Sequence, residues 1–116
     1  MLLGLRTVVH HVKDLASATA FYTGVVGHDP YFNEPFYVGF NVGGYELGLI
    51  PDGDGAATYW GTNDIVAEHA RLISIGARAH DAITDVGGGI KTATVMDPFG
   101  NVLGIIENPH FSLAAA

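Results

Sequence analysis

The chain has 116 residues, of which 48% are hydrophobic and 15% charged, and this size and composition indicate one globular domain rather than a disordered segment. Five basic residues against twelve acidic ones give a formal charge of −7, and because the basic residues are scattered we expect no nucleic-acid partner. The sequence has no cysteine and no apolar run near the ~18 residues of a membrane span, so we expect no disulfide, no thiolate metal site and no membrane insertion.

The first half of the chain predicts a strand, a helix and a hairpin of two strands. Asp14 has a side chain that can cap a helix, and Gly27 is a plausible stop for it. The pair Gly43-Gly44 between two apolar segments is a strong hairpin signal. The predicted elements are a strand over residues 5–12, a helix over 15–26, and strands over 36–42 and 45–50.

The second half predicts the same order again. Asp64 can cap a helix that ends at Gly76, and the turn Asp97-Pro-Phe-Gly100 separates the last two strands. The predicted elements are a strand over residues 57–62, a helix over 65–75, and strands over 91–96 and 101–107.

The two halves also agree in detail, which predicts an internal duplication. Gly44-Tyr-Glu-Leu-Gly-Leu-Ile50 corresponds to Gly100-Asn-Val-Leu-Gly-Ile-Ile106. Glycine-bounded hairpins are common, but several matches in the same order favour duplication over coincidence. We therefore predict one domain over residues 1–112, made of a module at 5–51 and a module at 57–108. Residues 113–116 are interpreted as a remnant of an expression vector.

Four segments carry a resemblance to a known family: Val12-Lys-Asp-Leu15, Ala20-Phe-Tyr-Thr-Gly-Val-Val-Gly27, the Gly-Gly hairpin, and Asp97-Pro-Phe-Gly-Asn101. In this order and spacing, over about residues 5–108, the chain resembles the vicinal oxygen chelate superfamily, the glyoxalase/bleomycin-resistance group. The resemblance implies an α+β fold of two βαβββ modules with curved mixed sheets around a shared cleft. It also implies a homodimer. Its members include lyases, isomerases, dioxygenases and proteins that only sequester drugs, so the fold constrains function loosely.

Metal-using members of that superfamily place one His, Gln or Glu ligand near the start of the first strand and one in the last strand of each module. Aligned on the shared landmarks, these positions fall on Thr7, Gly48, Ala57 and Gly104. None of the four offers a usual ligand, so we predict no metal and no other cofactor. A divalent metal held by an unusual ligand set is the alternative.

Strand alternation gives the residues expected to line the cleft. If Thr7 faces inward, His11 shares its side, and if Gly48 does, Glu46 shares its side. Leu47 and Leu49, together with Val38 and Phe40 of the neighbouring strand, then belong to the helix side. The predicted ligand-binding residues are Thr7, His11, Tyr37, Asn41, Glu46, Gly48, Tyr59 and Gly104.

Two further expectations concern these cleft residues. His11 and Glu46 are candidate catalytic residues for proton transfer, although a structural hydrogen bond or no contact at all is the favoured interpretation. The missing side chains at Gly48 and Gly104 leave room where flat rings of a ligand could stack. Trp60 is expected on the face opposite to Tyr59.

The sequence thus predicts a metal-independent protein that binds a small molecule and sequesters a drug or metabolite. The acidic charge is compatible with a cationic ligand without selecting one. One alternative is a lyase, isomerase or dioxygenase-like enzyme, either metal-free with His11 and Glu46 or with an unusual metal site. Another is an interaction module with a vestigial pocket. The absence of cysteine and of a recognisable signal peptide leads us to expect a cytoplasmic protein.

Overall fold

The computed structural model describes residues 1–53 and 55–111 and contains two compact units. The first module comprises residues 7–56, and the second module comprises residues 57–111 together with residues 1–6. The predicted modules, 5–51 and 57–108, have slightly different bounds, and Leu5 and Arg6 group with the second module instead of the first. The predicted vector remnant at 113–116 lies outside the described residues. Within the described part of the chain, no helix has both the length and the apolar character needed to cross a membrane.

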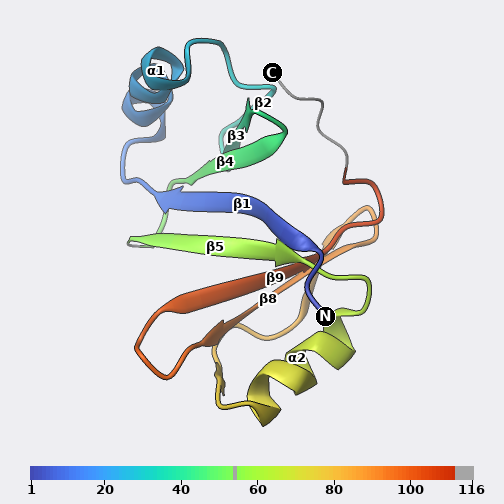
Figure 1. Ribbon diagram of the computed structural model, residues 1–116. Helices are drawn as coiled ribbons and strands as arrows, with labels where there is room; N and C mark the ends of the chain where they lie inside the picture. Colours follow the sequence, from blue (N-terminus) through green and yellow to red (C-terminus); the bar gives the residue numbers. More distant parts are fainter. Residues whose placement is uncertain (54, 112–116) are drawn as a thin grey trace. The chain divides into compact units, whose positions relative to one another are not determined.

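The first module contains one helix and a four-stranded mixed sheet in the order β2-β3-β4-β1 (Figure 1). Strands β1 and β4 run parallel, and the other neighbours run antiparallel. The hairpin between β3 and β4 turns at Gly43 and Gly44, whose φ angles of 63° and 89° favour glycine. The elements are β1 (Gly4–His11, whose residues 4–6 group with the second module), α1 (Leu15–Val26), β2 (Phe32–Glu34), β3 (Tyr37–Val42) and β4 (Tyr45–Ile50).

The second module repeats this arrangement with the strand order β5-β9-β8-β6, and β7 also pairs with β8. Strands β5 and β9 are parallel, as β1 and β4 are in the first module. The short strands β6 and β7 were not predicted, because they lie in a polar, glycine-rich stretch without strand periodicity. The elements are β5 (Ala56–Gly61), α2 (Ile65–Ser74), β6 (Arg78–Ala79), β7 (Thr84–Gly87), β8 (Ile90–Met96) and β9 (Val102–Glu107).

Both helices begin at the predicted aspartates. The carboxylate of Asp14 accepts a hydrogen bond from the backbone N–H of Ser17, and that of Asp64 accepts one from Ala67, so each satisfies a donor that the first helical turn leaves free. Helix α1 ends at Gly27, which has a left-handed φ of 90°. The helices are therefore placed by short-range chemistry that is readable from the sequence.

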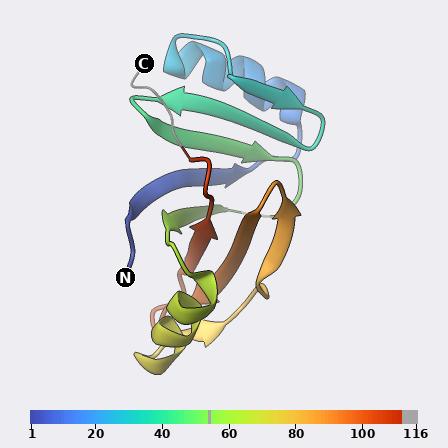
Figure 2. The ribbon, with the colours of Figure 1, turned by 90° about the vertical axis from the view of Figure 1, so that its right-hand side faces the viewer.

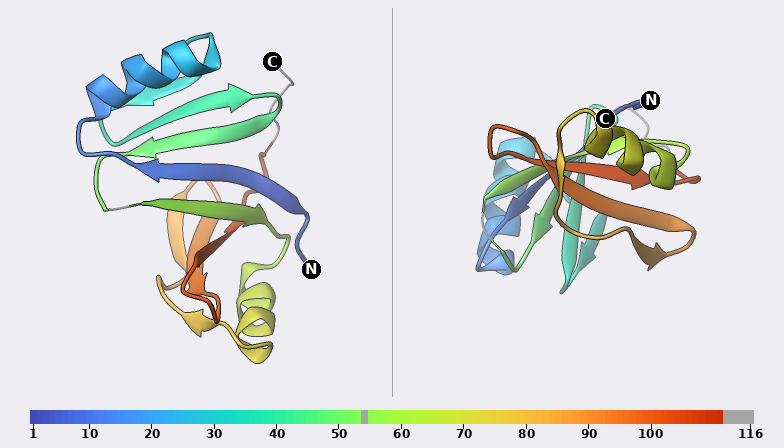
Figure 3. Two further views of the ribbon diagram at one scale, coloured as in Figure 1. Left: turned by 60° about the vertical axis from the view of Figure 1, so that its left-hand side comes forward. Right: turned by 90° about the horizontal axis from the view of Figure 1, so that it is seen from below.

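One face of each sheet is covered by the helix of the same module. In the first module α1 packs on β3 and β4 (Figure 2), where Val38, Phe40 and Leu49 are almost wholly buried. In the second module α2 packs on β8 and β9 (Figure 3), where Ala93, Val95 and Ile105 are buried with Ile65 and Leu72 of the helix. Burial of each of the larger side chains contributes about 1.5–3 kcal/mol. The predicted helix-side residues Val38, Phe40, Leu47 and Leu49 all belong to the first of these cores.

Candidate functional site

A carboxylate surrounded by hydroxyl groups lies on the face of the first sheet that α1 does not cover. Glu46 of β4 is in register with Thr7 of β1, and the Thr7 hydroxyl donates to Glu46 Oε1 at 2.9 Å. The Tyr37 hydroxyl donates to the same oxygen at 2.6 Å, and the Tyr31 hydroxyl donates to Oε2. We call these four residues, Thr7, Tyr31, Tyr37 and Glu46, the Glu46 cluster.

No basic side chain balances this carboxylate among the described residues. In that part of the chain, the carboxylates that form ion pairs are those of Glu68 and Asp81, both in the second module. Burial of the Tyr31 phenol raises its pKa, and the hydrogen bond and negative charge of Glu46 raise it further. Tyr31 therefore remains a neutral donor well above neutral pH. The site combines the carboxylate of Glu46 with two phenol donors.

Two glycines make this arrangement possible. A Cβ atom on Gly48 would lie 2.7 Å from Cζ of Tyr37, and one on Gly39 would lie 2.7 Å from Glu46 Oε2 and 3.2 Å from Cε1 of Tyr31. The two 2.7 Å contacts are shorter than a carbon atom normally makes, so Tyr37 and Glu46 would have to shift, and the 3.2 Å contact is also tighter than usual. The interpretation that Gly48 leaves room for a ligand's ring is therefore wrong, because the ring of Tyr37 occupies that space.

The second module shows the same relation between a glycine and a tyrosine. Tyr59 of β5 is in register with Gly104 of β9, and a Cβ atom on Gly104 would lie 2.5 Å from Cδ1 of Tyr59. Burial raises the pKa of Tyr59, with a smaller contribution from the charge of Asp81. The Asp81 carboxylate accepts a hydrogen bond from the Thr94 hydroxyl at 2.9 Å. Because the ring of Tyr59 lies where a side chain at position 104 would stand, the chain's own tyrosine takes this space too.

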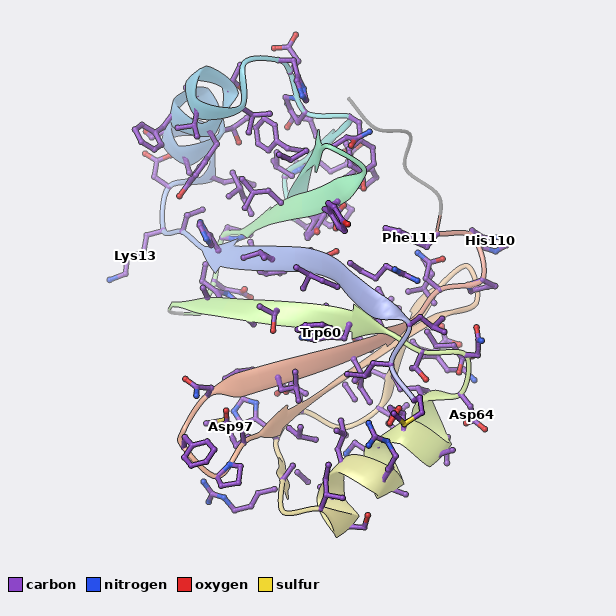
Figure 4. All side chains as sticks on the ribbon, in the orientation of Figure 1. Lys13, Trp60, Asp64, Asp97, His110 and Phe111 are labelled. Atoms are coloured by element: carbon purple, nitrogen blue, oxygen red, sulfur yellow. The ribbon has the colours of Figure 1, made fainter. Side chains whose placement is uncertain are left out.

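Trp60 lies on the opposite face of β5 from Tyr59, as predicted. Its indole N–H donates to the hydroxyl of Thr58 at 3.1 Å, and residues two apart on a strand share a face. Trp60 is labelled in Figure 4.

Of the remaining predicted residues, His11 and Asn41 form hydrogen bonds with backbone groups of nearby turns. Nδ1 of His11 is hydrogen-bonded to the carbonyl of Asp52, and Oδ1 of Asn41 accepts from the backbone N–H of Gly44 at 2.9 Å. The candidate acid–base pair of His11 with Glu46 is not formed. His11 is in register with Ile50, four residues from Glu46, which corresponds to about 13 Å along a strand.

Tyr31 belongs to the site but was not predicted. It precedes β2, and its backbone N–H donates to the carbonyl of Gly39 at 3.0 Å, which directs the side chain over β3 towards Glu46. A glycine inside a predicted strand often marks a close approach by another group. Gly39 was thus the one signal in the sequence that something packs against this part of β3.

No protein-family model matches the chain, and no curated protein matches it. Several solved structures of other proteins do match the chain. Methylmalonyl-CoA epimerase from Streptomyces coelicolor, in complex with 2-nitronate-propionyl-CoA, is similar with a TM-score of 0.75 and 16% identity over 97% of this chain and 99% of that one. A glyoxalase/bleomycin resistance protein/dioxygenase superfamily member from Vibrio splendidus 12B01 is similar with a TM-score of 0.69 and 18% identity over 90% of this chain and 99% of that one.

The chain has the glyoxalase/bleomycin-resistance fold. The predicted α+β class and the resemblance to the vicinal oxygen chelate superfamily are thereby confirmed at the level of the fold. The Mn(II)-bound glyoxalase from Novosphingobium aromaticivorans is also similar, with a TM-score of 0.71 and 19% identity, and here the match covers 99% of this chain and 42% of that one.

The residues at the four positions that the family resemblance assigns to metal ligands do not fit a divalent ion. Thr7 donates its hydroxyl to Glu46, while at Gly48 and Gly104 tyrosine rings occupy the space in which a ligand side chain would stand. The fourth position, Ala57, carries only a methyl group. Across residues 1–53 and 55–111, no three His, Asp or Glu side chains gather closely enough to hold a metal ion. The side chains at these four positions are thus a hydroxyl, a methyl group and two hydrogens.

Proposed function

We propose that this protein binds a small organic molecule at the Glu46 cluster, holds it without converting it, and needs no metal to do so. The observation that supports this most directly is the convergence of the Thr7, Tyr31 and Tyr37 hydroxyls on the carboxylate of Glu46. Aromatic walls with a few fixed polar groups are typical of small-molecule sites.

The physical cost of the cluster supports a binding role over a merely structural one. Glu46 lies only partly buried on a sheet face, and two strand glycines are needed to let the tyrosines reach it. Glycine inside a strand destabilises it by roughly 0.5–1 kcal/mol relative to alanine. A fold that needed only stability at this face would gain more from apolar side chains, which pack without a desolvated charge.

Assembly and location form a separate part of the proposal. We propose a cytoplasmic homodimer, on the basis of the resemblance described above and of the absence of cysteine. Small-angle scattering of the purified protein gives its mass in solution directly, and a monomeric mass over the full concentration range would contradict the dimer.

A thermal-shift screen of metal-free protein against cationic, neutral and anionic small molecules tests the binding function. A ligand present at about 100 times its Kd should stabilise the protein by about 2.7 kcal/mol. The variant Glu46→Gln should weaken binding of a responding compound by about tenfold or more, because hydrogen bonds to a charged group contribute about 1.5–3 kcal/mol.

The matched control is Asp85→Asn, which removes one negative charge from the exposed strand β7 of the second module. It should leave the response unchanged. If no compound responds, or if every response is the same in Glu46→Gln, the proposed binding site is wrong.

A second function is favoured by one distance, the 2.6 Å hydrogen bond between the Tyr37 hydroxyl and Glu46. Short charge-assisted bonds of this kind hold proton donors and acceptors in position for transfer. In that case a responding compound would be turned over, and Glu46→Gln would abolish turnover while binding persisted. Product analysis by mass spectrometry after incubation with each responding compound distinguishes the enzyme from the sequestering protein.

A further inference from the structure

An aromatic wall stands beside the Glu46 cluster. The ring of Phe32 in β2 lies 6.1 Å from the ring of Tyr37 and 6.1 Å from that of Phe36. Phe32 is in register with Gly39, and directly opposed residues of antiparallel strands share a face, so Phe32 and Glu46 lie on the same face of the sheet.

These rings remain exposed although they are large and apolar. Tyr31 is 53% exposed, Phe32 39% and Phe36 66%. Exposed apolar surface that is grouped rather than scattered marks a place where something binds. A ligand that covers Phe32 and Tyr31 would bury this apolar surface and would at the same time reach the carboxylate of Glu46.

The charge around this surface selects a cation. Lys13 is the only Lys or Arg between residues 7 and 56, and it lies between β1 and α1 with its side chain pointing away from the sheet (Figure 4). Glu34 is in register with Tyr37 and adds a second carboxylate to the same face. Glu34 and Glu46 thus put two carboxylates on the face that carries Phe32 and Tyr37, and aromatic ring faces attract cations on their own account.

The hydrogen bonds already made by Glu46 narrow the kind of cation. An ionised carboxylate offers about four lone-pair sites, and the described hydroxyls of Thr7, Tyr31 and Tyr37 use three of them. A primary ammonium group brings three N–H donors, whereas Glu46 keeps about one lone-pair site for them. A quaternary ammonium group has no N–H donor, so it needs only a negative charge and ring faces nearby.

We propose that the ligand of the Glu46 cluster carries a quaternary, or fully alkylated, ammonium group that lies against Tyr31, Phe32 and Tyr37 and is neutralised by Glu46. This inference rests on the proposed binding function and adds the chemical class of the ligand. The aromatic faces supply the contact area, and the carboxylate supplies the countercharge.

Calorimetric titration with three small probes tests the class directly. Choline carries the quaternary ammonium group, 3,3-dimethylbutan-1-ol is its uncharged carbon counterpart, and ethanolamine carries a primary ammonium. Choline should bind about tenfold more tightly than the uncharged alcohol, the difference expected from placing a cation over aromatic faces near a carboxylate. Ethanolamine should bind more weakly than choline.

Two variants locate the binding. Phe32→Leu keeps an apolar side chain but removes the ring, and Glu46→Gln keeps the shape but removes the charge; each should reduce the preference for choline over the alcohol. The matched control is Phe21→Leu, because Phe21 is a 65% exposed phenylalanine on α1 and lies on the opposite side of the sheet. It should leave choline binding unchanged.

The outcomes separate the two proposals. If neutral or anionic compounds of the thermal-shift screen bind in a manner that depends on Glu46, while choline binds no better than the alcohol, the ligand class is wrong and the binding function stands. If neither the probes nor any compound of the screen binds, both proposals fail. Equal choline binding by the wild type and by Glu46→Gln would also overturn the assignment of the ammonium group to this site.

Discussion

A Cβ atom on Gly48 would lie 2.7 Å from Cζ of Tyr37, and closer still to its hydroxyl oxygen, so the tyrosine stands where a side chain at position 48 would have to be. The second module has the same relation between Gly104 and Tyr59. In both modules the missing side chain is thus matched by a ring from a neighbouring strand. Position 48 and Tyr37 form one unit of packing, and this unit can be tested by substitution.

Gly48→Ala should destabilise the protein by about 1–3 kcal/mol, the usual cost of forcing an extra carbon into a packed site. Adding Tyr37→Ala should remove much of that penalty, so the double-mutant cycle should show a coupling of about 0.5–3 kcal/mol. Urea unfolding of the four proteins measures both quantities.

The control for this cycle is Gly24→Ala in α1. A Cβ atom there meets nothing within 4 Å, and alanine is favoured over glycine in a helix by about 0.5–1 kcal/mol. Gly24→Ala should therefore stabilise the protein. If Gly48→Ala did the same, Tyr37 would not occupy the space assigned to it.

The Thr7 hydroxyl should stabilise the fold through Glu46. Thr7→Val replaces a donor that is 6% exposed with a methyl group of similar size and leaves Glu46 Oε1 with one donor fewer. Losing a hydrogen bond to a charged acceptor should cost about 1.5–3 kcal/mol. Thr84→Val on exposed β7 should change the stability by less than about 0.5 kcal/mol, and equal effects of the two substitutions would contradict the role of Thr7.

High pH should destabilise the protein through Tyr31. Its folded-state pKa is raised above the usual value near 10, so the folded chain holds this proton more tightly than the unfolded chain does. The stabilisation is then fully present below about pH 10, where the unfolded tyrosine begins to ionise, and is lost as the pH rises towards the folded-state pKa. Urea unfolding between neutral and strongly alkaline pH measures the slope.

The variant Tyr31→Phe has no phenol to ionise and should show a shallower loss of stability with rising pH. Tyr59, whose pKa is also raised, accounts for part of the slope that remains. An unchanged slope in Tyr31→Phe would show that its proton does not contribute.

Removal of metal should have no effect on the protein. Treatment with a chelator should leave Tm and the affinity for any compound found in the screen unchanged, because the side chains at the ligand positions are a hydroxyl, a methyl group and two hydrogens. Elemental analysis of protein purified without chelator provides the independent measurement. Stoichiometric nickel, zinc, iron or manganese that is needed for binding would contradict the metal-free proposal.

Strand alternation predicted which side of the sheet many of these residues occupy, because its period of two depends on the backbone alone. Phe40 and Leu49 lie against α1, and Tyr37 and Glu46 lie on the other face, as expected. The partners across that face could not be predicted in the same way. Which hydroxyl reaches Glu46 depends on strand register and side-chain rotamers, and neither is determined by a local pattern.

One omission and one rejected alternative have the same physical origin. Tyr31 was missed because its position depends on how the segment before β2 crosses Gly39, which is a long-range contact. The His11–Glu46 pair was considered because both residues face the same side, but side-chain parity says nothing about distance along the strands. The face of a sheet that a residue occupies and the residue that caps a helix can be predicted from the local sequence. Which side chains meet in the site depends on residues that are distant in sequence.

The packing of Tyr37 over Gly48 also limits how such a chain can evolve. A histidine or glutamate introduced at position 48 alone would collide with the phenol before it could contribute to a metal site. Removing Tyr37 first would take one of the described donors from Glu46 and leave a gap beside the glycine. Either order passes through a less stable intermediate, so a metal ligand at position 48 can be reached by single substitutions only at a cost in stability.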